Sequence, residues 1–396
     1  MRTGIGVRRI AINDGIREAQ GLEGKSTEGW LVMTKTVLIA GGSGVVGFSA
    51  LEEFLADDHW DIINVSRRRP EPKRTRPFRH LSVDLRNADQ CKESLGNLRG
   101  VTHVVYASLY EKPGLIAGWT ERDQMETNLQ MLMNTIEPLS TGANDLKHVG
   151  ILQGTKAYGL HLHPIPIPAR ERAPRDHHEN FYWLQEDYIV QRAAALGFDF
   201  TILRPQLIVG APFGAAMNLA PVIGAYAAIC SELGEPFGFP GGPSYVWEAV
   251  DARLLAKVLK WATEAPQAKG QHFNVTNGDV FEWRSLWPMF AEVLGVGLGS
   301  DNPRSLGSFL PANTDVWRGI VKKHDLRKIE IEELVGESHH YADFCFAFGA
   351  KEAYPPAFVS TVKLRQAGFC EFVDTEDMFR HWLSYLIDEK VIPKSN

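Results

Sequence analysis

Three glycines spaced three residues apart are the part of this sequence with the clearest chemistry. An apolar run at residues 36–40 leads directly into them, and a helical pattern follows. Residues without a β-carbon let the backbone approach a pyrophosphate, and the first amides of the following helix point toward its negative charge. We expect a dinucleotide phosphate site here, with a tight turn that binds nothing as the alternative. The candidate residues are Gly41, Ser43, Gly44, Val45, Val46 and Gly47.

The second predicted strand, residues 61–65, is followed by Ser66 and three arginines. An enzyme that prefers NAD normally has an acidic residue here to bind the adenosine ribose. Guanidinium groups instead pair with a phosphate, so Arg67 and Arg68 predict a preference for the 2′-phosphorylated cofactor, NADPH. The alternative is a solvated basic loop, which is the better interpretation for the basic residues at positions 73–79.

The spacing of the glycines resembles that of the short-chain dehydrogenase/reductase superfamily. This resemblance implies further cofactor contacts at the ends of the third and fourth strands, beside the adenine and beneath the cofactor. The residues at these positions are Asp84, Leu85, Ala107 and Ser108.

In this superfamily a tyrosine and a lysine four residues later usually share one helix face. The candidate tyrosine is Tyr182, but Glu186 occupies the position of the lysine and cannot lower the pKa of a phenol. The positive charge must therefore come from another segment. Lys156 follows a predicted strand on the cofactor side, and we expect it to supply this charge, with Gln153 contacting the cofactor nearby.

Lys156 and the segment around Tyr182 together resemble the progesterone 5β-reductase/iridoid synthase family. That family pairs such a lysine with a tyrosine in the pattern N-F-Y-[YW]-x-x-E-D, which residues 180–187 match, and the likeness extends from Lys35 onward. It implies an NADPH-dependent reductase of enones or enals in which hydride reaches the β-carbon. Tyr182 would hydrogen-bond the carbonyl oxygen, while Lys156 would orient the ribose and make the phenol strongly acidic.

The resemblance weakens at the substrate pocket. Leu109 stands where plant members of the family tend to have a tryptophan, and the segment between Lys156 and Tyr182 is shorter and rich in proline and histidine. The sequence therefore indicates a small hydrophobic α,β-unsaturated carbonyl but no particular steroid or iridoid precursor. Candidate wall residues, each equally compatible with an ordinary core, are Leu109, Tyr158, Met217, Phe344 and Phe346.

The elements that must position these residues alternate between short buried strands and helices. Strands are predicted at residues 36–40, 61–65, 80–83, 103–107, 148–152 and 201–203. This alternation indicates an α/β fold, a doubly wound parallel Rossmann sheet. Residues 33–205 would form the NADP-binding domain with both catalytic residues. Residues 206–396 would form a smaller, mainly helical substrate cap, with some segments returning to the sheet.

Composition narrows the class of protein. The 396 residues carry a net charge of −6, which argues against nucleic-acid binding. Four cysteines without metal-ligand spacing predict reduced thiols, no metal site and a cytoplasmic protein. The longest apolar run, residues 217–230, is too short to span a membrane and predicts a buried helix. Residues 1–32 fit no packing pattern and are expected to be a disordered extension.

Three hypotheses about function remain open from the sequence. The first is the reductase of activated C=C bonds with Lys156 and Tyr182. The second is a carbonyl reductase or NAD(P)-dependent epimerase of the extended short-chain type, against which Glu186 argues. The third is a sensor that binds the dinucleotide and turns nothing over. The sequence leaves the oligomeric state open, a homodimer included.

Overall fold

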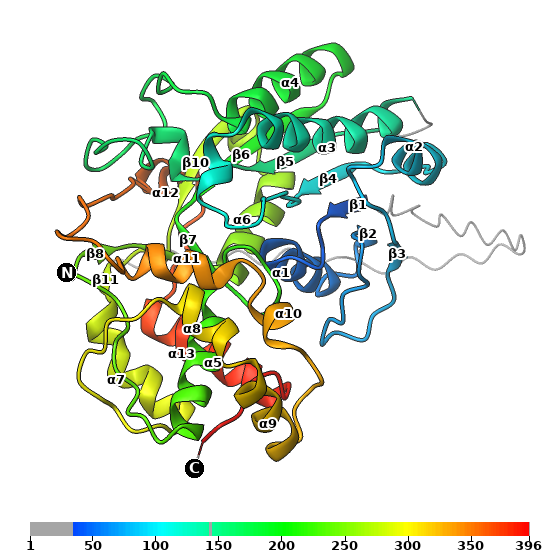
Figure 1. Cartoon of the computed structure of the whole chain (residues 1–396). Helices are drawn as coiled ribbons and strands as arrows, with labels where there is room; N and C mark the ends of the chain where they lie inside the picture. Colours follow the sequence, from blue (N-terminus) through cyan, green and yellow to red (C-terminus); the bar gives the residue numbers. More distant parts are fainter. Residues whose placement is uncertain (1–34, 142–144, 396) are drawn as a thin grey trace, which may run out of the picture. The chain divides into compact units, whose positions relative to one another are not determined.

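A seven-stranded parallel sheet forms the centre of the computed structural model, which describes residues 35–141 and 145–395 (Figure 1). Its strand order is β10-β6-β5-β4-β1-β2-β3. The strands are β1 (Lys35–Ala40), β2 (Trp60–Val65), β3 (Arg79–Leu81), β4 (His103–Tyr106), β5 (His148–Leu152), β6 (Asp199–Pro205) and β10 (Gln271–Val275). The first six are the strands predicted from the sequence, and the doubly wound fold is confirmed. The extension expected at residues 1–32 lies outside the described residues.

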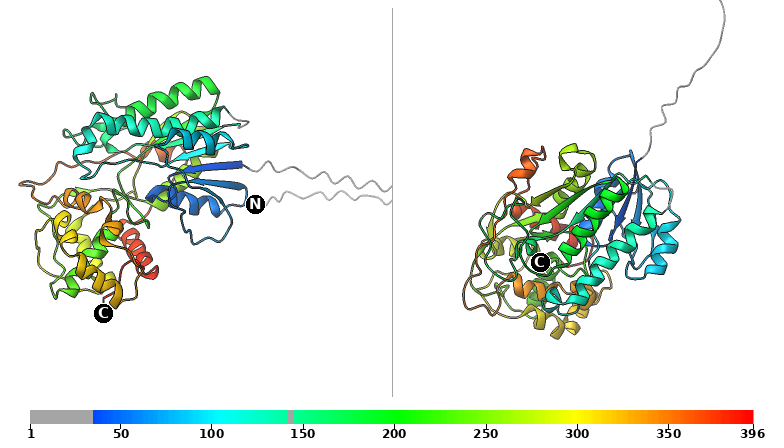
Figure 2. Two further views of the ribbon diagram at one scale, coloured as in Figure 1. Left: turned by 45° about the vertical axis from the view of Figure 1, so that its right-hand side comes forward. Right: turned by 90° about the horizontal axis from the view of Figure 1, so that it is seen from above.

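Helices cover both faces of this sheet (Figures 1 and 2). In β1, Val37 and Ile39 pack with one buried cluster, and Leu38 and Ala40 with the cluster on the opposite face. Successive side chains of a strand point to opposite faces, so a strand covered on both sides is apolar at consecutive positions. One layer contains α1 (Val45–Leu55) and α6 (Ala252–Glu264), and the other contains α2 (Ala88–Gly96), α3 (Arg122–Ser140) and α4 (Phe181–Leu196).

The seventh strand, β10, was not among the strands predicted from the sequence. It pairs with β6 in parallel, with Phe273 opposite Leu203, and it comes from the part of the chain expected to be mainly helical. Helix α6 precedes β10 and packs on α1. Strand β10 therefore completes one edge of the sheet, and α6 helps to cover one face. The short helix α12 (Val362–Gln366) lies beside β10.

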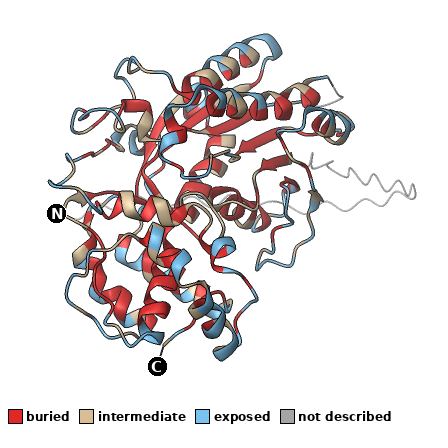
Figure 3. Ribbon diagram, viewed as in Figure 1, coloured by how far each residue is buried: buried red, intermediate tan, exposed pale blue. Residues whose placement is uncertain are grey.

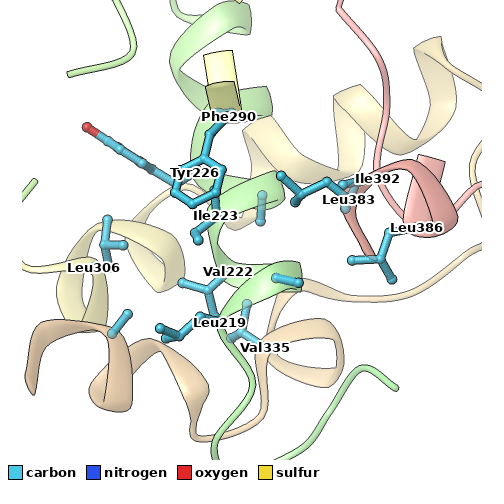
Figure 4. Close-up of a cluster of buried hydrophobic side chains, with 14 of the residues drawn as sticks. Leu219, Val222, Ile223, Tyr226, Phe290, Leu306, Val335, Leu383, Leu386 and Ile392 are labelled. Atoms are coloured by element: carbon cyan, nitrogen blue, oxygen red, sulfur yellow. The ribbon is translucent and has the colours of Figure 1, made fainter. Parts of the chain in front are cut away.

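A helical cap is built around α5 (Leu219–Glu232), in which every residue from Leu219 to Cys230 is buried. This is the buried helix that the apolar run predicts. Figure 4 shows Val222 and Tyr226 of α5 facing side chains of the surrounding helices, and Figure 3 shows the same core as a buried region. The surrounding helices are α7 (Trp283–Leu294), α8 (Leu306–Ala312), α9 (Thr314–Lys323), α10 (Ile331–Val335), α11 (Ser338–Cys345) and α13 (Thr375–Asp388).

Two strand pairs lie outside the main sheet. They are β7 (Leu207–Val209) with β9 (Ala249–Asp251), and β8 (Val246–Trp247) with β11 (Phe281–Glu282). Sheet and cap belong to one compact unit. Within the described ranges, no helix combines the length and the apolar character needed to cross a membrane.

Candidate active site

A cavity of about 600 Å³ lies at the carboxyl ends of the central strands, with walls from both the sheet and the cap. The loops that follow β1, β2, β4, β5 and β6 all contribute residues to it. The strand order changes direction between β1 and β4, and ligands of open α/β sheets bind in the crevice beside such a switch point. Topology alone therefore places the candidate site in this cavity.

The glycine turn after β1 lines the cavity, with Ser43, Val45 and Val46 beside it in the wall. Gly41 has a φ of +90°, and a β-carbon there would come within 2.8 Å of the Ala107 backbone. Helix α1 begins after Gly44, which provides no side-chain cap, so the first amides of the helix remain available to an anion. The turn thus fits a pyrophosphate.

Gly47 lies outside the cavity wall and has a different role in the turn. A β-carbon on Gly47 would lie 2.2 Å from the Gly41 carbonyl oxygen, so this glycine lets α1 pack closely against the turn.

We expect Gly47→Ala to lower the free energy of unfolding by about 1–3 kcal/mol, because the added methyl group overpacks the turn. Chemical denaturation would measure the loss. Gly319→Ala is a matched control, since Gly319 is an exposed helix residue with open space around it. Equal stability of the Gly47 variant and the control would contradict this role.

Arg67 and Arg68 follow β2 and reach the cavity wall with exposed side chains. The loop that carries them is fixed locally: Ser66 Oγ donates to the Arg68 carbonyl at 2.7 Å, and Ser82 Oγ donates to the Arg67 carbonyl at 2.9 Å. The backbone of this loop is therefore fixed, and Arg68 Nη1 lies 3.9 Å from a carboxylate oxygen of Glu333. By contrast, Arg76 bonds the carbonyls of Asp57 and Trp60 and is structural.

The other residues expected to contact a cofactor also line the cavity. They are Asp84, Leu85, Ala107, Ser108 and Gln153. Two of them already have polar partners within the protein. The Asp84 carboxylate pairs with Arg86 at 2.7 Å, and the Gln153 amide bonds Glu186 at 2.7 Å and accepts from Arg204 at 2.8 Å.

Lys156 enters the cavity from the 3-10 helix Thr155–Tyr158, directly after β5. Its ammonium Nζ lies 4.1 Å from the centroid of the Trp119 ring, 4.0 Å from a carboxylate oxygen of Glu111 and 6.0 Å from the centroid of the Tyr182 ring. Burial lowers the pKa of Lys156 to about 8, and the Glu111 charge opposes this fall. The lysine and tyrosine, which come from different elements, therefore share one cavity.

Tyr182 lies in the first turn of α4, and its backbone is fixed at both ends. Its amide donates to the Asn180 side chain at 3.0 Å, and its carbonyl accepts from Gln153 at 3.3 Å. The hydroxyl lies close to Gly154, where a β-carbon would come within 3.0 Å of it. The lack of a side chain on Gly154 therefore leaves room for the Tyr182 phenol beyond the end of β5.

The acidity of Tyr182 differs from the expectation of a strongly acidic phenol. Burial raises the pKa of Tyr182, and the negative charge of Glu111 raises it further. The reason is that a phenolate would lose its hydration in this cavity while facing a carboxylate. At neutral pH the side chain is therefore a hydroxyl that can donate a hydrogen bond.

Glu186, four residues after Tyr182, faces away from the phenol into a set of buried polar contacts. It pairs with Arg175 at 2.9 Å and His272 at 3.1 Å, in addition to its bond with Gln153. Although burial opposes ionisation, these hydrogen bonds lower the pKa of Glu186 to about 2. Glu186 thus links α4 to β10 and to the loop after β5.

Of the five expected substrate-wall residues, Leu109, Met217 and Phe344 line the cavity. Tyr158 and Phe346 do not. The Tyr158 hydroxyl donates to Asn274 at 2.7 Å, and its ring packs in a separate cluster. Phe346 is buried in the cap core, with its ring centroid 4.9 Å from that of Trp283.

Several cavity residues were not identified from the sequence. Among them are Glu111, Trp119, His161 and Tyr341. Glu111 follows β4 by five residues, so its position beyond a strand end was an available signal. Trp119 meets Phe344 of α11 edge to face at 5.7 Å, a contact between distant segments that has no local signal.

Sequence comparisons identify relatives of this chain. The model of the PRISE-like Rossmann-fold domain matches residues 83–346. An (S)-8-oxocitronellyl enol synthase of Antirrhinum majus is 30% identical over 376 residues, which cover 90% of this chain and 92% of that enzyme. A 3-oxo-Delta(4,5)-steroid 5-beta-reductase of Arabidopsis thaliana is also 30% identical, with the same coverage of both chains.

Solved structures with a similar fold are more distant in sequence. A UDP-glucose 4-epimerase from Bifidobacterium longum, in complex with NAD+ and UDP, has a TM-score of 0.62 and 15% identity over 89% of this chain and 98% of that one. The enzyme from Thermotoga maritima has a TM-score of 0.61 and 14% identity, covering 89% and 99% of the two chains. At this identity the likeness shows the fold alone.

Proposed function

Because the chain belongs to the PRISE-like family of progesterone 5β-reductase and iridoid synthase-like enzymes, we propose that it reduces the activated C=C bond of an enone or enal with NADPH. The observation that carries this proposal is the position of Lys156 and Tyr182 in one cavity, whose wall also includes the glycine turn. A nicotinamide dinucleotide bound in this cavity supplies the hydride for such a reduction.

Tyr182 and Lys156 act on the carbonyl end of the substrate. Conjugate reduction develops negative charge on the carbonyl oxygen, which then needs a donor already in place. Tyr182 keeps its proton at neutral pH because burial raises its pKa, so it donates a hydrogen bond to that oxygen. The Lys156 ammonium adds a positive charge in the same dehydrated site.

We divide the cavity lining into a cofactor side and a substrate side. We assign the dinucleotide to the glycine turn, Arg67, Arg68 and the strand ends. We assign the substrate to the part of the cavity lined by Leu109 and by Met217 and Phe344 of the cap. Both predicted domains contribute to each part of this lining, since Leu109 belongs to residues 33–205 and Gly214 of the later residues lies near Arg68.

Arg67→Ala should raise the KM for NADPH by about tenfold or more and leave the KM for NADH nearly unchanged, because only NADPH has the 2′-phosphate. Initial rates with both cofactors would measure the ratio. The matched control is Arg69→Ala: Arg69 lies over the Phe78 ring at 4.7 Å and outside the cavity wall. An unchanged cofactor ratio in the Arg67 variant would show that this side chain does not bind the phosphate.

One panel of substrates tests the proposed reaction. NADPH oxidation would be followed with enones and enals, with the matching saturated ketones and with a nucleotide sugar, and the products would be identified by mass spectrometry. We expect NADPH to be consumed with the unsaturated substrates. The product should be heavier than the substrate by the hydrogens added across the C=C bond. Consumption with saturated ketones alone would favour a carbonyl reductase, conversion of the nucleotide sugar without net NADPH oxidation would favour an epimerase, and no conversion of any substrate would favour a sensor.

A further inference from the structure

Glu111 is a buried carboxylate beside the proposed catalytic lysine. It lies in the loop after β4, and its side chain is 2% exposed. One oxygen accepts a hydrogen bond from Gln124 Nε2 of α3 at 2.6 Å. The other, Oε1, lies 4.0 Å from Lys156 Nζ and has no hydrogen-bond partner among the residues that the structure describes. Buried carboxylates normally have partners. Burial raises the pKa of Glu111, and the Lys156 charge opposes this rise together with the contacts of Gln124 and Trp119, so the ammonium is one of the groups that favour the ionised carboxylate.

The other groups around Lys156 carry no negative charge at neutral pH. Trp119, from the 3-10 helix Ala117–Thr120, presents a neutral ring. His161, from the loop after Lys156, stays neutral because burial lowers its pKa to about 4. Tyr182 of α4 and Tyr341 of α11 stay protonated because burial raises their pKa values.

A second carboxylate, Glu337, lies at the start of α11 and also lines the cavity. It accepts a hydrogen bond from the Gly114 amide at 2.9 Å, whereas the ion pair within 4.0 Å of Lys156 is made by Glu111. Within the described ranges, Glu111 is therefore the carboxylate that acts on this lysine.

We infer that Glu111 is a positioning residue, which keeps Lys156 as an ammonium and holds it beside Tyr182. An opposite charge within about 4–6 Å favours the charged form of an ionisable group. The hydrogen bond from Gln124 holds one carboxylate oxygen of Glu111, so the position of the second oxygen is fixed as well. The inference concerns the charge of Lys156, and its consequence for turnover rests on the proposed function.

The direction of the pH effect follows from these charges. Burial lowers the pKa of Lys156, and Glu111 raises it, with a net value of about 8. When the Glu111 charge is removed, burial acts alone and the pKa of Lys156 falls further. Lys156 then loses its proton at a lower pH, and the reaction steps that need the ammonium stop at that lower pH.

Glu111→Gln tests this directly. The amide retains an oxygen that can accept from Gln124 and has nearly the same size as the carboxylate. The pH dependence of acetylation of Lys156 by trace acetic anhydride, read by peptide mass spectrometry, measures its titration without any need for activity. We expect the midpoint to move down by about one unit or more. An unchanged midpoint would overturn the inference.

Two further variants separate charge from structure. Glu121→Gln removes the same charge from an exposed position that pairs with Lys112, and it should leave the Lys156 midpoint unchanged. Glu111→Asp keeps the charge on a shorter arm, so its shift should be smaller than that of the glutamine variant. An equal shift in the aspartate variant would show that loss of packing, and not of charge, moves the titration. If the glutamine variant does not fold, a downward shift of the midpoint in the aspartate variant supports the inference, because the shorter arm moves the carboxylate away from the ammonium, and an unchanged midpoint overturns it.

Steady-state kinetics give the second readout. With an enone substrate, the alkaline limb of the pH profile of kcat should shift down together with the acetylation midpoint. If the acetylation midpoint shifts but the alkaline limb does not, Glu111 still controls the charge of Lys156. Such a result would contradict the catalytic role of that charge. Absence of enone reduction in the wild type would contradict the proposed function, while acetylation would still decide the inference.

Discussion

Replacing Lys156 with methionine should lower kcat for enone reduction by about 10²- to 10³-fold while the protein stays folded. Methionine retains most of the apolar stem that packs against Trp119 and removes the ammonium 6.0 Å from the Tyr182 ring centroid. Because the charge acts on an oxygen that becomes negative during the reaction, kcat and kcat/KM should fall together. Steady-state rates and thermal unfolding would be measured on the same preparation.

A matched lysine elsewhere controls for charge and packing. Lys363 is also partly buried over an aromatic ring, 5.2 Å from the Phe273 centroid, but it lies outside the cavity wall. Lys363→Met should therefore leave turnover close to that of the wild type. Full activity of the Lys156 variant would contradict its proposed role, whatever the behaviour of the control.

The second large effect is expected for Tyr182→Phe. Phenylalanine keeps the ring contact with Phe181, whose centroid lies at 4.4 Å, and the backbone bond to Asn180. The hydroxyl alone is lost, and with it one donor to the developing enolate, which costs about 10²–10³ in kcat. The same assay of NADPH oxidation with an enone would measure the loss.

Tyr158→Phe provides the contrast. Its buried hydroxyl donates to Asn274 at 2.7 Å, outside the cavity, so its removal should cost about 1 kcal/mol of stability and little turnover. If Lys156 and Tyr182 act as a unit, the double variant should be about as slow as the slower single variant. Fully multiplicative losses would indicate that the two side chains act independently.

Local patterns in the sequence predicted most of the sheet but not all of it. Most of the predicted strands are marked by apolar runs such as residues 37–40, which are buried on both faces, although β3 at the sheet edge is polar and partly exposed. The seventh, β10, joins the edge of the sheet beside β6, and polar residues such as Gln271 and Asn274 interrupt its apolar pattern. Its membership in the sheet depends on pairing with a strand about seventy positions earlier, which no local pattern encodes.

The same distinction applies to the cavity. The glycine turn, Lys156 and Tyr182 each belong to a short segment whose composition indicates its chemistry, and all three lie in or beside one cavity. Tyr158 is only two residues from Lys156, but on a 3-10 helix this spacing turns its side chain to another face. Trp119 reaches the lysine through tertiary packing that has no local signal, whereas the only sequence signal for Glu111 is its position five residues after a strand.

The separate origins of Lys156 and Tyr182 have a consequence for how the protein should inactivate. A tyrosine and a lysine on one helix stay neighbours for as long as that helix persists. Here one partner follows a strand and the other begins α4, so their proximity depends on how the helix docks on the sheet. Mild denaturants or heat that loosen side-chain packing before they melt secondary structure would therefore abolish turnover in a state with near-native far-ultraviolet circular dichroism.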